Sequence, residues 1–164
     1  MRVALGMKAR TGRAVLVAVG GNAREPRFVE RTQIPLLPEG AFAPYHAAEG
    51  LPKDQAHESV KRSIAAAHRL AASGIRKAAK RCTDSGHQLV ACAVLVGAGM
   101  PNWSVDEILA VHVHMHQAEG ELFRDVLVAG AKTCGLEPVT LRDKAAFDDA
   151  TAMLGLGGLG LMPS

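Results

Sequence analysis

The chain has 164 residues, of which 48% are hydrophobic, and this is the size and composition of one folded domain with a continuous core. Nineteen basic residues stand against 16 acidic ones, so the net charge of +3 permits a phosphate-containing partner without requiring a nucleic acid. No stretch approaches the roughly 20 apolar residues that cross a bilayer, and the N-terminus lacks the apolar run of a signal peptide. We therefore expect a cytoplasmic protein without a membrane partner.

The three cysteines fit the same compartment. Cys82, Cys92 and Cys134 are an odd number, show no CxxC spacing and lie in apolar or helical surroundings. This pattern predicts reduced core thiols rather than a disulfide framework.

The first third of the chain has the pattern of three strands. Residues 2–7 and 14–19 are apolar runs separated by a turn-like segment, and the second run is rich in β-branched side chains. Residues 27–34 alternate imperfectly, as an edge or half-exposed strand does. These segments predict a three-stranded meander.

Prolines and glycines punctuate residues 35–52, which predicts a long loop and excludes a regular helix or central strand there. Long loops inside compact domains more often carry function than connecting loops do. Tyr45, His46 and Glu49 are therefore candidate site residues.

The middle of the chain predicts a helix followed by a buried strand. Residues 53–80 have an apolar residue at roughly every third or fourth position, which is typical of a long amphipathic helix. Residues 89–96 are apolar on both faces, as in a central strand covered by helices.

The last third predicts a helix, a strand and a second helix. Ser104 and Glu107 have the S-x-x-E spacing of a capping box, and the helix that they open should continue to about Cys134. A short strand at 138–141 and a helix at 144–154 complete the expected elements. We thus expect a single domain over residues 1–154 and a flexible Gly/Leu-rich tail over 155–164.

Within the capped helix, His112, His116 and Glu119 stand at positions i, i+4 and i+7, so their side chains share one face. Imidazole nitrogen and carboxylate oxygen are ligands of zinc and similar ions, so the spacing predicts a divalent-metal site and a metal cofactor. The competing interpretation is ordinary surface or core packing of helical histidines. A strand over 109–116 would instead gather His112, His114 and His116, but the capping box favours the helix.

One pentapeptide pattern occurs twice, as HAAEG at 46–50 and as HQAEG at 116–120. Alanine and glycine are frequent in this chain, so chance explains the recurrence about as well as function does. If the recurrence is functional, the loop copy closes over the helical copy and forms a pocket with His-Glu pairs that transfer protons. The candidate catalytic residues are then His46, Glu49, His116, Glu119 and Glu121.

Arg124 is a candidate substrate-binding residue, together with Tyr45, because a guanidinium can clamp a phosphate or carboxylate group. The alternative is an ordinary pair with Glu121, three residues earlier. The sequence has no GxSxG motif, Walker lysine or complete GxGxxG loop. The expected chemistry therefore depends on histidine and glutamate.

The predicted order of elements, βββαβαβα around a mixed five-stranded sheet, resembles the ribonuclease H-like superfamily and especially its Holliday-junction resolvase branch. The resemblance implies a three-layer α/β fold. In that superfamily the first strand carries a metal-binding aspartate, whereas Met7 and Lys8 stand at the matching place here. Only Asp148 and Asp149 stand where the late carboxylates of the family fall, so the resemblance implies a degenerate member in which the two-metal mechanism is not expected.

A second resemblance covers residues 44–51 and 116–124. These segments are similar to PYHAAEGL and HxAEGELFR in a group of bacterial proteins. This resemblance implies no particular activity.

These patterns support three hypotheses. The first is a hydrolase that acts on a phosphate-containing or nucleic-acid substrate through the His/Glu site. The second is a non-catalytic ribonuclease H-like module that binds nucleic acid or a protein partner. The third is a homodimer whose partner copy packs against a helical face made of Leu109, Met115, Leu122 and Phe123.

Overall fold

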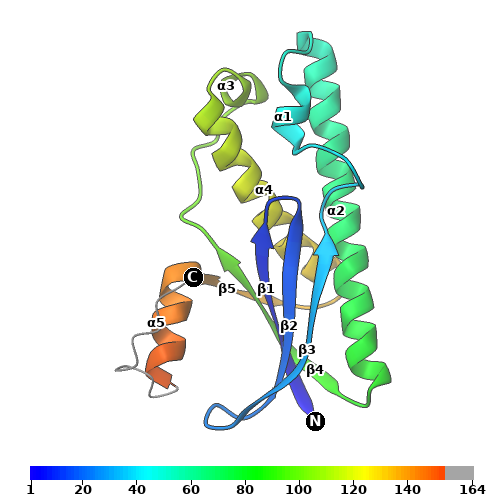
Figure 1. The fold of residues 1–164 in the computed structure, drawn as a ribbon, viewed down its shortest axis with the longest axis vertical. Helices are drawn as coiled ribbons and strands as arrows, with labels where there is room; N and C mark the ends of the chain where they lie inside the picture. The colour runs from blue at the N-terminus through cyan, green and yellow to red at the C-terminus, as the bar shows by residue number, and fades with distance from the viewer. Residues whose placement is uncertain (154–164) are drawn as a thin grey trace.

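The computed structural model describes residues 1–153, which form helices and strands arranged about one sheet (Figure 1). The strands are β1 Arg2–Arg10, β2 Arg13–Gly21, β3 Pro26–Pro35, β4 Gln88–Val96 and β5 Pro138–Arg142. The helices are α1 Pro44–Ala48, α2 Lys53–Asp84, α3 Val105–Leu109, α4 His112–Thr133 and α5 Asp143–Met153.

The five strands form a mixed sheet in the order β3-β2-β1-β4-β5. The first three strands are an antiparallel meander, and β4 and β5 are added parallel to β1. Helices lie on both sides of the sheet, so the predicted three-layer α/β fold with a mixed five-stranded sheet is confirmed (Figure 1).

The main core lies between the sheet and the two long helices, α2 and α4. Alternate residues of β1, namely Val3, Leu5 and Met7, face these helices and are at most 2% exposed. Each such side chain stabilises the fold by about 1.5–3 kcal/mol when it leaves water. Other fully buried members of this core are Leu16, Leu36, Ile75, Phe123 and Leu127.

A second cluster of buried residues lies where α1, α3 and the N-terminal parts of α2 and α4 meet. Its members are Tyr45, Ala48, Ala56, Val60, Ile108, Met115 and Ala118. Asp106 links α3 to α2. The Asp106 carboxylate pairs with His57 of α2 at 2.7 Å and with Lys53 of α2 at 3.1 Å. The hydrogen bond from His57, followed by that from Lys53, lowers the pKa of Asp106. This cluster fixes α1 beside the start of α4.

Two predictions of local structure need correction. The 35–52 segment contains a short helix, α1, because Pro44 supplies the backbone angle of a first helical residue and its missing N–H needs no partner there. The helix expected from Ser104 to Cys134 is two helices. The capping box of Ser104 and Glu107 is present, but Val111 has extended backbone angles that end α3 and start α4 in a new direction.

Other boundaries differ only slightly from those predicted. The amphipathic helix α2 continues to Asp84, and the last helix begins at Asp143. The predicted tail, 155–164, lies outside the described residues.

The thiols of Cys82, Cys92 and Cys134 are free, as predicted. Burial is the main cause that raises the pKa of Cys82 and of Cys92. No helix within residues 1–153 has the length and apolar character needed to span a membrane.

Gly74 of α2 allows the helix to approach the edge strand β3, and its substitution tests this packing. A Cβ at Gly74 would lie 2.7 Å from Cβ of Ile34, which is a β-branched residue that cannot swing away. We expect Gly74→Ala to lower the free energy of unfolding, because overpacking costs about 1–3 kcal/mol and the helix-propensity gain of about 1 kcal/mol offsets only part of it.

The matched control is Gly120→Ala on α4, where the added methyl meets only an ordinary contact at 3.8 Å. This variant should be as stable as the wild type or slightly more stable. Urea unfolding measures both, and equal stability of the two variants would contradict the close packing.

Candidate functional site

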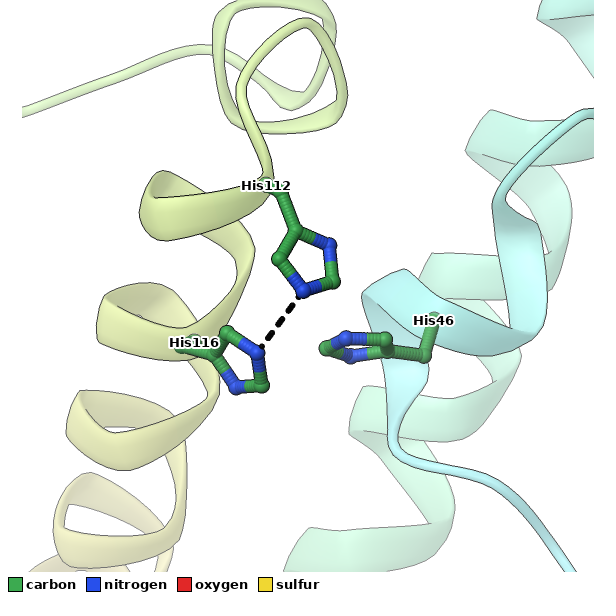
Figure 2. Close-up of side chains that lie close together, drawn as sticks. All are labelled: His46, His112 and His116. Carbon is green, nitrogen blue, oxygen red and sulfur yellow. Dashed lines mark hydrogen bonds between the residues drawn. The ribbon is translucent and has the colours of Figure 1, made fainter.

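Three histidines converge beside the second cluster (Figure 2). His46 comes from α1, and His112 and His116 come from the first two turns of α4. Nε2 of His112 and Nε2 of His116 are 3.0 Å apart. The ring centroid of His46 is 5.2 Å from that of His112 and 4.7 Å from that of His116. One nitrogen from each ring lies within 4.8 Å of the other two, so the three side chains can hold one metal ion.

Glu119 lies behind this histidine cluster and is 4% exposed. Its Oε1 accepts hydrogen bonds from the backbone N–H groups of Tyr45 and His46, each at 3.0 Å. These are unpaired donors in the first turn of α1, whose N-cap residue Ala43 provides no side-chain acceptor. Glu119 therefore caps a helix that is more than 70 positions away in the sequence.

The same carboxylate orients the ring of His46. Nδ1 of His46 is 2.8 Å from both oxygens of Glu119. A carboxylate that accepts from Nδ1 leaves Nε2 as the nitrogen that faces a ligand, and it makes that nitrogen a better donor of electrons to a metal. Burial, together with the negative charge of Glu119, raises the pKa of the Tyr45 phenol.

A cavity of about 510 Å³ opens next to the histidine cluster. His46, His116 and Glu119 line one part of it. The rest is lined by Ala9, Arg10, Thr11, Phe42, Ala43, Gly120, Phe123 and Arg124. The site thus combines imidazoles, a buried carboxylate and two guanidinium groups around one hollow.

The structure brings some of the predicted site residues together and separates others. His46, His116 and Glu119 are in contact, so the two copies of the HxAEG pattern meet at their first residues. Glu49 ends α1, is exposed and does not line the cavity. Tyr45 is 7% exposed and packs in the second cluster, so only its backbone reaches the site.

Arg124 and Glu121 form the pair that was weighed as an alternative. Nη1 of Arg124 donates to Oε1 of Glu121 at 2.8 Å, and the side chains are 35% and 14% exposed respectively. Arg124 also lines the cavity, so the pair and a role in anion binding are compatible. Gly97 lies against this guanidinium, since a Cβ there would be 2.5 Å from Nη1.

The helical geometry separates His114 from its neighbours. Its ring stacks on Trp103 with centroids 3.8 Å apart, away from the His46, His112 and His116 cluster. The helical face that was expected to bind a second copy lacks two of its predicted residues, because Met115 and Phe123 are buried within the chain. Association of two copies remains a prediction, without these two residues on its surface.

The sequence analysis missed Arg10, Thr11 and Phe42. They come from the end of β1, the turn after it and the loop before α1. No local motif marks them, because they meet α4 only through the parallel pairing of β1 with β4 and the packing of α4 on that sheet.

Met7, Lys8 and Asp148 stand at the positions that the sequence resemblance compares with metal-binding carboxylates. Met7 is buried against the helices, and Lys8 faces the other side of the sheet, where it pairs with Asp143 at 2.8 Å. Asp148 lines a different hollow, beside Arg142 and Lys144. The only group of three or more candidate metal ligands among residues 1–153 is the histidine cluster.

No protein-family model matches the sequence, and no curated protein matches it. Among solved structures, the chain is similar to the Aquifex aeolicus member of the Ppx/GppA protein family, with 8% sequence identity and a TM-score of 0.40. The alignment covers 88% of this chain and 35% of that one, so the chain spans about a third of its length. A likeness at this level carries no argument about function.

Removing the Glu119 carboxylate tests its structural role. Glu119→Ala leaves two backbone donors and one ring donor without their acceptor. We expect the free energy of unfolding to fall by about 1–3 kcal/mol, the usual cost of unsatisfied buried donors. The control Glu58→Ala removes an exposed carboxylate of α2 and should change stability by less than about 0.5 kcal/mol. Equal urea midpoints for the two variants would show that Glu119 does not hold α1.

Proposed function

We propose that the protein is a metal-dependent hydrolase of phosphate esters, with one divalent ion held by His46, His112 and His116. The observation that carries this proposal is the convergence of three imidazoles, two of which line a cavity that two arginines also line. Glu119 is proposed as a positioning residue behind His46 rather than as a metal ligand, because three donors already occupy its oxygens.

The spacing of His112 and His116 fits zinc or a similar ion. Ligand nitrogens about 2.0–2.1 Å from a tetrahedral zinc ion are separated by about 3.3 Å. The 3.0 Å between the Nε2 atoms of His112 and His116 is close to this value. Three protein ligands leave a fourth position for water or substrate, which distinguishes catalytic zinc sites from closed structural ones.

The chemistry follows from the charge of the ion. A bound divalent ion lowers the pKa of a coordinated water to about 7 and polarises a phosphoryl oxygen. Hydrolysis would add the oxygen of a water molecule to phosphorus and break the ester P–O bond, and a proton of that water would go to the leaving alcohol. Arg10 and Arg124 would neutralise the charge that develops on the other phosphate oxygens.

We also propose that the fold is ribonuclease H-like and degenerate. The sheet order and the succession of elements support this assignment. The chain replaces the carboxylates of that superfamily with Met7 and Lys8, so a single histidine-bound ion is proposed in place of a pair of carboxylate-bound ions.

Metal titration of each histidine variant tests the proposal. Protein stripped with a chelator should bind one zinc or cobalt ion per chain in calorimetry. Loss of a carboxylate behind a ligand commonly weakens metal binding by about 10–100-fold. We expect a loss at least this large for His46→Ala, His112→Ala and His116→Ala, together with loss of hydrolysis of p-nitrophenyl phosphate.

His114→Ala is the matched control, since His114 is on the same helix and stacks on Trp103 outside the cluster. It should keep the wild-type metal affinity. Unchanged affinity in all three cluster variants, or an equal loss in His114→Ala, would refute the site.

A second candidate function, a module that binds single-stranded nucleic acid, is favoured by the open face of the sheet. Positions that alternate with the buried residues of β1, and their partners on β2 and β3, carry the cations Arg2, Lys8, Arg10, Arg13 and Arg31. On this face Lys8 pairs with Asp143 at 2.8 Å, whereas Glu30 turns to the other side of the sheet and pairs with Arg81. Val15, Val17 and Leu95 form an apolar floor between the cations. Phosphates and bases match this combination.

Binding of a fluorescent single-stranded oligonucleotide at two salt concentrations tests this candidate. Affinity should fall as salt rises, because phosphate contacts release counterions. Arg31→Glu should weaken binding further, whereas Arg62→Glu on the exposed side of α2 should have little effect. An affinity that does not depend on salt, or that falls equally in both variants, would exclude this face of the sheet as the binding site.

A further inference from the structure

The cavity beside the histidine cluster also restricts the kind of ester that fits. Its volume of about 510 Å³ lies within the range of about 300–1,000 Å³ that is typical of small-molecule sites. One side is closed by Phe123, which is 2% exposed, and by the helical backbone at Gly120. The cavity therefore suits a small molecule better than the middle of a polymer.

The charges around the cavity suit a dianion. With the proposed ion in place, its two positive charges and the guanidiniums of Arg10 and Arg124 stand against the carboxylates of Glu119 and Glu121. The histidines are neutral when they bind a metal. This leaves two positive charges in excess, which match the two negative charges of a phosphate monoester better than the single charge of a diester.

Arg10 is the cation that is most available to a ligand. It is exposed at the end of β1 and lines the cavity, and no carboxylate among residues 1–153 pairs with it. Arg124 uses one nitrogen for Glu121 and keeps other N–H groups. The hydroxyl of Thr11 lies next to Arg10 in the turn and can donate to the same phosphate.

Phe42 adds an aromatic surface at the rim. Its side chain is 76% exposed although it lines the cavity. The turn closed by the Ala41 N–H and the Pro38 carbonyl, at 3.0 Å, and the start of α1 at Pro44 hold the segment on both sides of it. An exposed phenyl ring on a segment that is held at both ends favours contact with a flat apolar group of a ligand.

We propose that the cavity binds a small phosphate monoester, in its dianionic form, whose alcohol carries an aromatic ring. The phosphate lies between the metal ion, Arg10 and Arg124, and the ring lies against Phe42. This assignment rests on the proposed hydrolase function. Water is consumed, the P–O bond to the alcohol breaks, and orthophosphate and the protonated alcohol are released.

Rates on matched model substrates test the assignment. The metal-loaded protein should hydrolyse p-nitrophenyl phosphate with a kcat/KM at least about tenfold above that for bis(p-nitrophenyl) phosphate, because the diester lacks the second charge. Benzyl phosphate, whose leaving alcohol is about as basic as glycerol, should be preferred to glycerol 1-phosphate by about 2–10-fold through contact with Phe42. Adenosine 5′-monophosphate and phosphotyrosine, compared in the same way, distinguish a nucleoside from a phenol as the source of the ring.

Two variants with matched controls assign the residues. Arg10→Gln should lower kcat/KM for the monoester by about 10–100-fold, because it loses a charged hydrogen bond. Arg13 faces Arg10 across the β1–β2 pair and does not line the cavity. Arg13→Gln should therefore leave kcat/KM for the monoester unchanged. Phe42→Ala should abolish the preference for benzyl phosphate over glycerol 1-phosphate, and Phe42→Tyr should keep it.

The outcomes separate this inference from the function on which it rests. Faster hydrolysis of the diester, an unchanged kcat/KM in Arg10→Gln, or an unchanged substrate preference in Phe42→Ala would overturn the inference while the hydrolase function stands. If neither ester is hydrolysed, the function fails, and calorimetry with adenosine 5′-monophosphate tests the ligand class alone. Binding that depends on Arg10 and Phe42 would support that class, and absence of binding would overturn it as well.

Discussion

The arrangement of the site depends on the buried carboxylate of Glu119. It accepts both backbone donors of the first turn of α1 and the Nδ1 proton of His46, so a single side chain of α4 fixes the position of α1 and the direction of one imidazole. Without it, α1 has no cap and His46 has no defined tautomer. A buried charge is costly unless its hydrogen bonds are satisfied, and here three donors satisfy it. Folding and the geometry of the histidine cluster therefore share one interaction.

The second cluster packs α1 against α4 next to this interaction. Tyr45 and Met115 bury their side chains there, immediately next to His46 and His116 in the chain. The break between α3 and α4 at Val111 lets α4 begin at His112, so that its first two turns face α1 instead of continuing the line of α3. Apolar packing thus places α1 near α4, and the hydrogen bonds of Glu119 fix the first turn of α1 and the orientation of the His46 ring. The imidazoles of His112 and His116 stay accessible because they lie on the outer side of that packing.

The sequence predicted the sheet well because alternation and apolar runs are local patterns. It also offered, beside chance recurrence, a loop copy of HxAEG that closes on the helical copy, and His46 does contact His116 and Glu119. It failed where the answer depends on contacts between distant segments. The helix within 35–52 is capped by Glu119, and no residue near Pro44 could reveal that acceptor. Arg10 reaches the cavity only through the pairing and packing of β1. The predicted ligand set of His112, His116 and Glu119 followed helical spacing, which cannot show that the carboxylate is already used by another helix.

The most direct test of this account is X-ray absorption spectroscopy of the zinc-loaded wild-type protein. A tetrahedral shell with three imidazole nitrogens at about 2.0–2.1 Å and one further light atom is the predicted result. Three imidazoles match the number supplied by His46, His112 and His116, and the absence of one imidazole from the spectrum of His46→Ala would assign that ligand to His46. A shell with two imidazoles and a carboxylate, or a zinc ion without defined histidine ligands, would contradict the account.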